Sequence, residues 1–211
     1  MTAAVGIRAT TLTPFAYHSL AVQGGTATLP ELISDNALCF GLANALGYAR
    51  AWCALPPKDY RRDLAAMPWR ASVLTTDQPR LLPPIARRLN LEEEGGFQKK
   101  LRDVVSKGNL KQFWSIQEVP PYVEFRGALF GPDPFEEVGA TQIVIRVGLH
   151  RNGMVKLERD DDVRRVRLNA ATAALFGQAQ ELAVERFLLY GLQLTKPIAL
   201  EEAAKEISRW N

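Results

Sequence analysis

The segment Tyr17-His18-Ser19 is the one place in this sequence where a general base and a hydroxyl lie together. A histidine in such a setting can activate and orient a ribose 2′-hydroxyl, as a metal-independent ribonuclease requires. The same histidine can equally be a loop residue that hydrogen-bonds RNA or the backbone. Gln23-Gly24-Gly25 follows, and its amides could hold a phosphate, although paired glycines more often only form a turn.

A second group of candidate residues lies in the basic segment from Arg87 to Lys111. Residues 85–111 hold seven Lys and Arg against four Asp and Glu, so their net charge of +3 equals that of the whole chain, with 26 basic and 23 acidic residues. Basic residues that run into aromatic ones are typical of single-stranded RNA binding, because cations neutralise phosphates and rings stack on bases. The residues concerned are Lys99, Lys100, Arg102, Lys107, Lys111, Phe113 and Trp114. Alternatively, the rings pack beneath the insertion and the charges only keep it soluble.

The sequence favours neither a metal site nor one of the common catalytic motifs. The chain has two histidines and two cysteines, none at ligand spacing, so no metal or other cofactor is expected. Cys39 and Cys53 are expected to be buried free thiols. The run from Asp160 to Asp162 precedes a basic run, which favours a solvated turn over a magnesium site. Nucleophile-elbow, Walker and dinucleotide motifs are missing.

The bulk composition predicts a cytosolic domain. No apolar stretch approaches the roughly 20 residues that span a bilayer, and the N-terminus has no leader pattern. At 211 residues and 47% hydrophobic content, one domain with elaborations is expected. We divide it into a core of residues 1–84 and 112–211 and a basic insertion of residues 85–111.

Alternating and helical patterns indicate the elements that position these residues. Val5, Ile7 and Ala9 predict a strand that turns Arg8 away from the core. A loop then leads to a helix that Ser34 or Asp35 caps.

Strands return after the insertion. Tyr122 to Phe130 predicts a strand with Arg126 on its polar face, and the alternation on either side of Asn152-Gly153 predicts a hairpin with a type I′ turn. Ala170 to Tyr190 and Glu201 to Trp210 are predicted to be helices. This order favours a ferredoxin-like (RRM-like) α+β fold with an antiparallel sheet and an inserted basic β-hairpin.

The chain resembles the Cas-five family of the CRISPR-associated RAMP superfamily, in versions of type I-D or type IV complexes. The resemblance rests on the opening strand Ile7-Arg8-Ala9-Thr10-Thr11-Leu12, on the loop through Tyr17-His18-Ser19 and Gly24-Gly25 to the helix with Asp35-Asn36-Ala37-Leu38 and Leu42-Ala43-Asn44-Ala45-Leu46-Gly47, and on the basic insertion that ends in a strand. It covers the first 50 residues best. The family's glycine-rich C-terminal loop has no clear counterpart.

The resemblance implies a non-catalytic RNA-binding subunit that caps the 5′ handle of a guide RNA (crRNA). It implies an RRM-like domain with a β-hairpin thumb, which Lys99 to Trp114 would form, and a handle-facing loop with Tyr17, His18 and Gly24 to Gly25. The implied partners are crRNA and the backbone and large subunits of a CRISPR effector. Contact with target DNA near the protospacer-adjacent motif stays open, and no membrane is expected.

Two other functions stay open. One is a metal-independent endoribonuclease that processes CRISPR repeat RNA with His18 as general base. The other is a protein-interaction subunit whose aromatic anchors are Phe113, Trp114, Trp69 and Trp210, with only incidental RNA contact.

Overall fold

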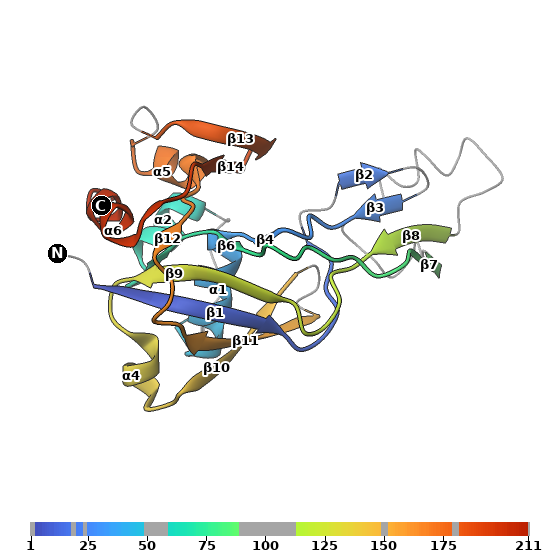
Figure 1. Cartoon of the computed structure of the whole chain (residues 1–211), viewed down its shortest axis with the longest axis horizontal. Coiled ribbons are helices and arrows are strands. Elements are labelled where there is room, and N and C mark those ends of the chain that lie inside the picture. The colour runs from blue at the N-terminus through green and yellow to red at the C-terminus, as the bar shows by residue number, and fades with distance from the viewer. Residues whose placement is uncertain are drawn as a thin grey trace.

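The computed structural model describes most of the chain, namely residues 3–17, 20–22, 25–48, 59–88, 113–148, 152–178 and 182–210. These residues form short helices and mostly antiparallel strands, which confirms the predicted α+β class. Figure 1 shows a body that holds the large sheet and the helices of the described residues, and an arm that extends from one end of it.

The main sheet holds seven strands in the order β10-β11-β1-β9-β6-β4, with β5 also paired to β9. Every pairing in it is antiparallel. The strands are β1 (Ala4–Thr11), β4 (Leu32–Ile33), β5 (Arg70–Ala71), β6 (Leu74–Thr75), β9 (Glu124–Phe130), β10 (Gln142–Val147) and β11 (Gly153–Arg159).

Strand β1 lies in the centre of this sheet, between β9 and β11. Its alternating sequence is the reason, because Ile7 and Ala9 are fully buried on one face while Arg8 between them stays partly exposed. The predicted strand and the outward direction of Arg8 are confirmed.

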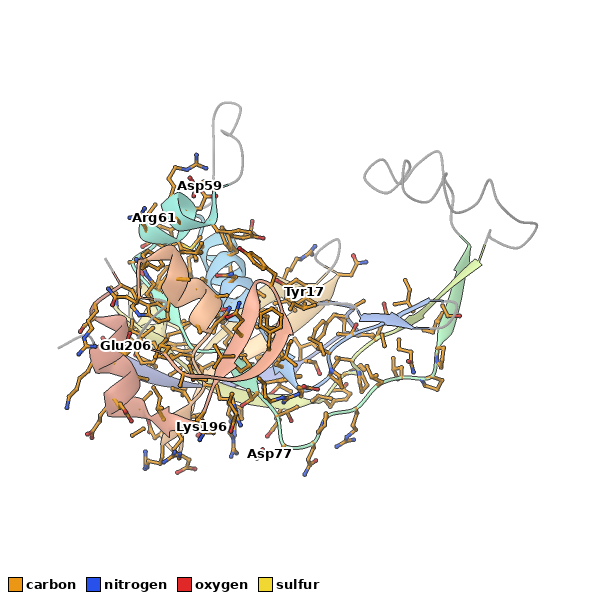
Figure 2. All side chains as sticks on the ribbon, turned by 90° about the horizontal axis from the view of Figure 1, so that it is seen from above. Tyr17, Asp59, Arg61, Asp77, Lys196 and Glu206 are labelled. Atoms are coloured by element: carbon orange, nitrogen blue, oxygen red, sulfur yellow. The ribbon has the colours of Figure 1, made fainter. Side chains whose placement is uncertain are left out.

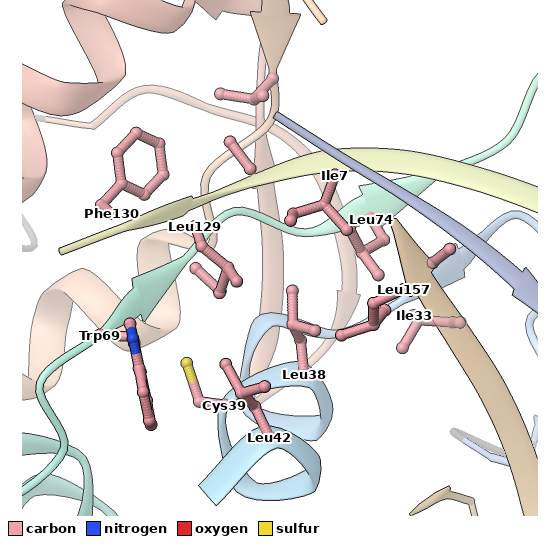
Figure 3. Packing of buried hydrophobic residues seen from close by; sticks show 14 of the residues in the cluster. Ile7, Ile33, Leu38, Cys39, Leu42, Trp69, Leu74, Leu129, Phe130 and Leu157 are labelled. Carbon is pink, nitrogen blue, oxygen red and sulfur yellow. The ribbon is translucent and has the colours of Figure 1, made fainter. Parts of the chain in front are cut away.

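Helix α1 (Asp35–Ala45) packs on the buried face of the sheet. Ser34 caps it as predicted, since its hydroxyl accepts a hydrogen bond from the Ala37 amide. Leu38, Cys39 and Leu42 of the helix lie among core residues of the strands, as Figure 3 shows.

Strands β10 and β11 form the predicted hairpin, but the predicted turn is wrong. Val147 pairs with Gly153, so the connection covers residues 148–152 and Asn152-Gly153 is not a two-residue turn. Gly153 lies in β11, paired with Val147, and the side chain of Phe15 packs against it, so that a Cβ atom there would be 2.5 Å from the Phe15 Cβ.

The predicted helix from Ala170 to Tyr190 is also wrong. Helix α5 (Ala170–Leu175) ends near Gly177, which has a left-handed φ of +78°, and the later residues form a hairpin of β13 (Val184–Leu189) and β14 (Leu192–Thr195). Phe187, which lies within the predicted helix, is 66% exposed on β13. Pairing with β14 outweighs the helical spacing of the apolar residues.

The remaining elements of the body are short. Strand β12 (Arg165–Val166) pairs with β15 (Ile198–Ala199), and α6 (Leu200–Ile207) follows directly and contacts β1 and β9. Helices α2 (Tyr60–Ala65) and α4 (Pro134–Val138) complete the set. Within the described ranges, no helix has the length and apolar character needed to cross a membrane.

The arm is a separate four-stranded sheet in the order β2-β3-β8-β7. Its strands are β2 (Leu20–Val22), β3 (Gly25–Ala27), β7 (Ile85–Arg88) and β8 (Phe113–Gln117). Seen from above in Figure 2, the arm again lies clear of the body. It therefore joins two segments that are far apart in the sequence.

Candidate nucleic-acid interface

The arm brings together the two sequence segments that were predicted to contact RNA. Strand β3 pairs in parallel with β8, so that Gly25 is opposite Ser115, and β8 pairs in turn with β7. The glycine-containing loop that follows Tyr17 thus shares one sheet with the base of the basic insertion. Nothing in the local sequence of either segment indicates this pairing.

The ends of β7 and β8 set where the insertion leaves the arm. Arg88 pairs with Phe113, and Arg87 pairs with Trp114. The 24 residues between Arg88 and Phe113 therefore begin and end at neighbouring positions of one hairpin.

Many of the predicted contact residues lie outside the described part of the chain. These are His18, Ser19, Gln23, Gly24, Lys99, Lys100, Arg102, Lys107 and Lys111. Gly25 lies on β3, and Phe113 and Trp114 lie on β8, where only the backbone is described. Cys53 and His150 also fall outside the described ranges.

Tyr17 lies where the arm meets the body, as Figure 2 shows. Its amide donates to the Thr28 hydroxyl at 3.2 Å, and its own hydroxyl lies 3.4 Å from the Ser34 hydroxyl at the start of α1. Burial raises the pKa of Tyr17, so the phenol stays protonated near neutral pH. Tyr17 therefore links the handle-facing loop of the sequence prediction to the helix cap.

Backbone hydrogen bonds also connect the arm to the body at this place. Phe15 and Val119 exchange two of them, with N···O distances of 3.2 and 2.9 Å, and Thr28 donates to the Gln117 carbonyl at 3.1 Å. Phe15 is only 1% exposed. The arm is therefore attached to the body by paired strands and a buried ring.

Arg8 and Arg126 lie on the outward face of the main sheet, opposite one another on β1 and β9. Each has an acidic partner: Arg8 lies 3.4 Å from Glu158, and Arg126 lies 3.2 Å from Asp160. Their side chains nevertheless remain 40% and 58% exposed, so both can still meet a ligand. Two like charges directly opposite one another are unfavourable, and the acids offset this cost.

Lys156 is a further cation on the same face, on the neighbouring strand β11, and the sequence analysis missed it. It pairs with Thr10 across the strands and lies 3.2 Å from Glu158. The hydrogen bond from Lys156, with Arg8 adding to it, lowers the pKa of Glu158. The alternation of β11 around Val155 and Leu157 was the signal that places Lys156 outward.

A polar cluster is buried at the start of α1. Asp35 is 2% exposed and accepts hydrogen bonds from the Asn169 amide at 3.0 Å and from the Thr172 hydroxyl at 2.5 Å. Asn169 also donates to the Gly191 carbonyl and accepts from the Gln193 amide. The cluster thus joins α1, α5 and the β13–β14 hairpin, and its fully paired groups fit a structural role.

Other residues considered for chemistry have structural surroundings. Cys39 is a buried free thiol, as predicted, and burial raises its pKa to about 12. Asp161 and Asp162 are exposed in a turn, but Asp160 is 9% exposed, contrary to the prediction of a solvated run, because it closes over Gly6 and faces Arg126. Across the ranges that the structure describes, no three His, Cys, Asp or Glu side chains gather as metal ligands.

Two of the aromatic anchors proposed for protein partners are not available at the surface. Trp69 is fully buried and donates its ring N–H to the Pro132 carbonyl at 3.0 Å. Trp210 is 2% exposed and stacks on Phe176 with a centroid distance of 6.2 Å. Both rings fill the core, so the prediction that they serve as exposed anchors is wrong.

Comparisons with known proteins assign no family. The sequence matches no known protein family, and no curated protein is similar to it. Among solved structures, the fold is similar to one chain of the cryo-EM structure of the Type III-B Cmr-beta bound to cognate target RNA and AMPPnP, state 1. The match has 11% sequence identity, covers 97% of this chain and 93% of that chain, and gives a TM-score of 0.46. A superposition this loose supports no argument about function.

Proposed function

We propose that this protein is a non-catalytic RNA-binding subunit of a CRISPR effector complex that holds the 5′ handle of the guide RNA. The observation that carries the proposal is the parallel pairing of β3 with β8. It joins the loop after Tyr17 to the base of the basic insertion, the two segments for which the resemblance to the Cas-five family implies RNA contact.

The outward face of the main sheet supports the same proposal. Arg8 and Arg126 are paired across β1 and β9, and Lys156 lies on the neighbouring β11, opposite Thr10. Arg126 is exposed and Arg8 is partly exposed. Because Arg8 and Arg126 face each other, a phosphate beside them would relieve their repulsion further. The bound strand would run from the arm onto this face.

The sheet order is compatible with the ferredoxin-like fold that we infer for the body. Four neighbouring strands in the order β11-β1-β9-β6 are antiparallel throughout, and α1 lies between β1 and β6 in the sequence. The expected partners are crRNA and neighbouring effector subunits.

RNA binding is tested by removing the charges of the insertion. Lys99, Lys100, Arg102 and Lys107 are all replaced by Ala, and binding of crRNA from the source organism is measured by fluorescence anisotropy at several salt concentrations. We expect the affinity to fall at least tenfold and the slope of log K against log salt to become less negative by about 0.7 for each phosphate that the variant no longer neutralises. Unchanged binding would show that these four residues of the insertion do not contact RNA.

A matched control removes the same number of charges elsewhere. Arg61, Arg164, Lys196 and Lys205 are exposed residues of the body, and Figure 2 shows Arg61 and Lys196 well away from the arm. Replacing these four by Ala should leave the affinity within about twofold, because charges beyond the Debye length of about 10 Å at 0.1 M salt are screened. An equal loss in both variants would indicate a general charge effect.

The nuclease alternative is tested with the same protein. CRISPR repeat RNA incubated with it in EDTA should stay intact. Cleavage that disappears in His18→Ala would show that the protein is a ribonuclease with His18 as its base.

A further inference from the structure

Tyr122 has an unusual backbone conformation at the root of the arm. Its φ is +63°, and within the described ranges it is the one residue other than glycine with a positive φ. A bulky side chain disfavours this left-handed conformation, and glycine or asparagine is the usual choice there. Strained residues of this kind cluster at ligand-binding sites.

Four hydrogen bonds hold the turn that imposes this conformation. The Thr11 hydroxyl donates to the Pro120 carbonyl at 2.8 Å and accepts from the Val123 amide at 2.9 Å, which joins the two ends of the turn. The Tyr122 amide donates to the Thr11 carbonyl at 2.7 Å, and the Thr11 amide donates to the Val123 carbonyl at 3.0 Å. The end of β1 therefore fixes Tyr122 in place.

The ring of Tyr122 contributes little to the core. The residue is 79% exposed, although its backbone is tied down on both sides. A large apolar ring is thus presented to solvent from a rigid support, which is the arrangement of a stacking platform because little conformational freedom is lost on binding.

The surroundings of Tyr122 favour a nucleic-acid base over a protein side chain as its partner. The chain passes Tyr122 as it returns from the arm into β9, and Arg126 follows four residues later, at most roughly 13 Å along the strand. Arg126 and the opposite Arg8 are exposed cations. Tyr122 thus carries an exposed ring on the stretch of chain that leads to the exposed Arg126, with the exposed Glu124 between them. A ring followed along the chain by cations fits a single strand of bases and phosphates.

We propose that a base of single-stranded RNA stacks on Tyr122 where the strand passes from the arm to the outward face of the sheet. This proposal rests on the proposed RNA-binding function and adds a specific contact to it. Arg126 and Arg8 take the neighbouring phosphates. Tyr122 takes a base and carries no charge.

The test separates stacking from charge and from folding. Tyr122→Asn removes the ring but suits the left-handed backbone, so the Tm should stay the same or rise. Binding of fluorescein-labelled oligo(A) and oligo(U) RNA should weaken about tenfold or more, and more for oligo(A), with an unchanged salt slope. Arg126→Ala should instead make the slope less negative by about 0.7.

Two control variants define the outcomes. Tyr122→Phe keeps the ring and should bind like the wild type. Tyr190→Asn removes another exposed ring, one that is 90% exposed on the β13–β14 hairpin of the body, and should also bind normally. If Tyr122→Asn binds with wild-type affinity, or if Tyr122→Phe binds weakly, the stacking proposal is wrong. The proposed RNA-binding function would still stand in either case. If Tyr122→Asn loses only an association with effector subunits, the ring binds protein and the proposal is wrong. If the wild-type protein binds neither oligo(A) nor oligo(U), the proposed RNA-binding function itself is wrong.

Discussion

At the scale of single residues, Asp35 is a buried titratable group that joins α1 to α5. Its carboxylate is buried and receives hydrogen bonds from Asn169 and Thr172. Burial raises the pKa of Asp35, and these hydrogen bonds lower it by a smaller amount. The folded state therefore holds the proton more tightly than the unfolded chain does.

This difference predicts how stability changes with pH. The unfolded Asp35 titrates at about 3.9. The stabilisation by its proton is complete below that pH and is lost as pH rises through the raised folded pKa, because the folded state binds more protons in that window. The wild type should therefore lose stability relative to the Asp35→Asn variant as the pH rises from about 3.9 to the raised folded pKa of Asp35. The quantity to follow is the free energy of unfolding of the wild type minus that of the variant. Urea unfolding at a series of pH values measures both, and a difference that rises with pH would contradict the assignment.

At the scale of elements, a close contact with the β10–β11 hairpin supports the root of the arm. The Phe15 ring packs on Gly153, and Phe15 is bridged to Val119 on the returning chain. A side chain at position 153 cannot fit unless the backbone at Phe15 moves, because the nearest atom to a Cβ there would be the Phe15 Cβ, at 2.5 Å. The glycine that resembles a turn residue in the sequence is therefore a packing residue.

Gly153→Ala should destabilise the protein by about 1 to 3 kcal/mol, because the added methyl group overpacks the contact with Phe15. Thermal unfolding measures the loss, and hydrogen exchange of the Val119 amide should become faster, since that amide bonds to the Phe15 carbonyl. Gly191→Ala is the matched control, because no atom lies within 4 Å of its Cβ position, and its effect should stay within about 0.5 kcal/mol. Equal losses in both variants would show that the contact has no special role.

At the scale of the whole molecule, a body with its own core carries an arm with a separate sheet. The segment of residues 89–112 leaves and re-enters the arm at the paired residues Arg88 and Phe113. It can therefore be removed without changing the strands that hold it.

A variant in which Asn-Gly replaces residues 89–112 tests this division, since Asn-Gly closes a tight hairpin well. The Tm should change by no more than a few degrees, because the core of the body is intact. RNA affinity should fall at least as far as in the fourfold Ala variant. Full affinity in the shortened protein would place RNA binding on the body alone, and an unfolded product would show that the insertion supports the fold.

The sequence by itself determined the features that depend on neighbouring residues. The alternation of β1 and β9, the outward directions of Arg8 and Arg126, and the Ser34 cap all follow from local periodicity and hydrogen bonding. Asn152-Gly153 and the segment after Gly177 show the limit, because a turn dipeptide and a helical spacing each fit more than one structure. Packing against Phe15 requires a glycine at position 153, and pairing with β14 makes the segment after Gly177 a strand.

Only the tertiary structure decided which distant segments meet. The pairing of β3 with β8 joins residues about 90 positions apart, and the Thr11 hydroxyl closes a turn at Pro120 to Val123. Such contacts leave no periodic signal, because they depend on how the sheet returns the chain to the same place in space. For the same reason, Tyr122 reads as an ordinary strand residue in the sequence, and its exposed, strained position exists only in the folded protein.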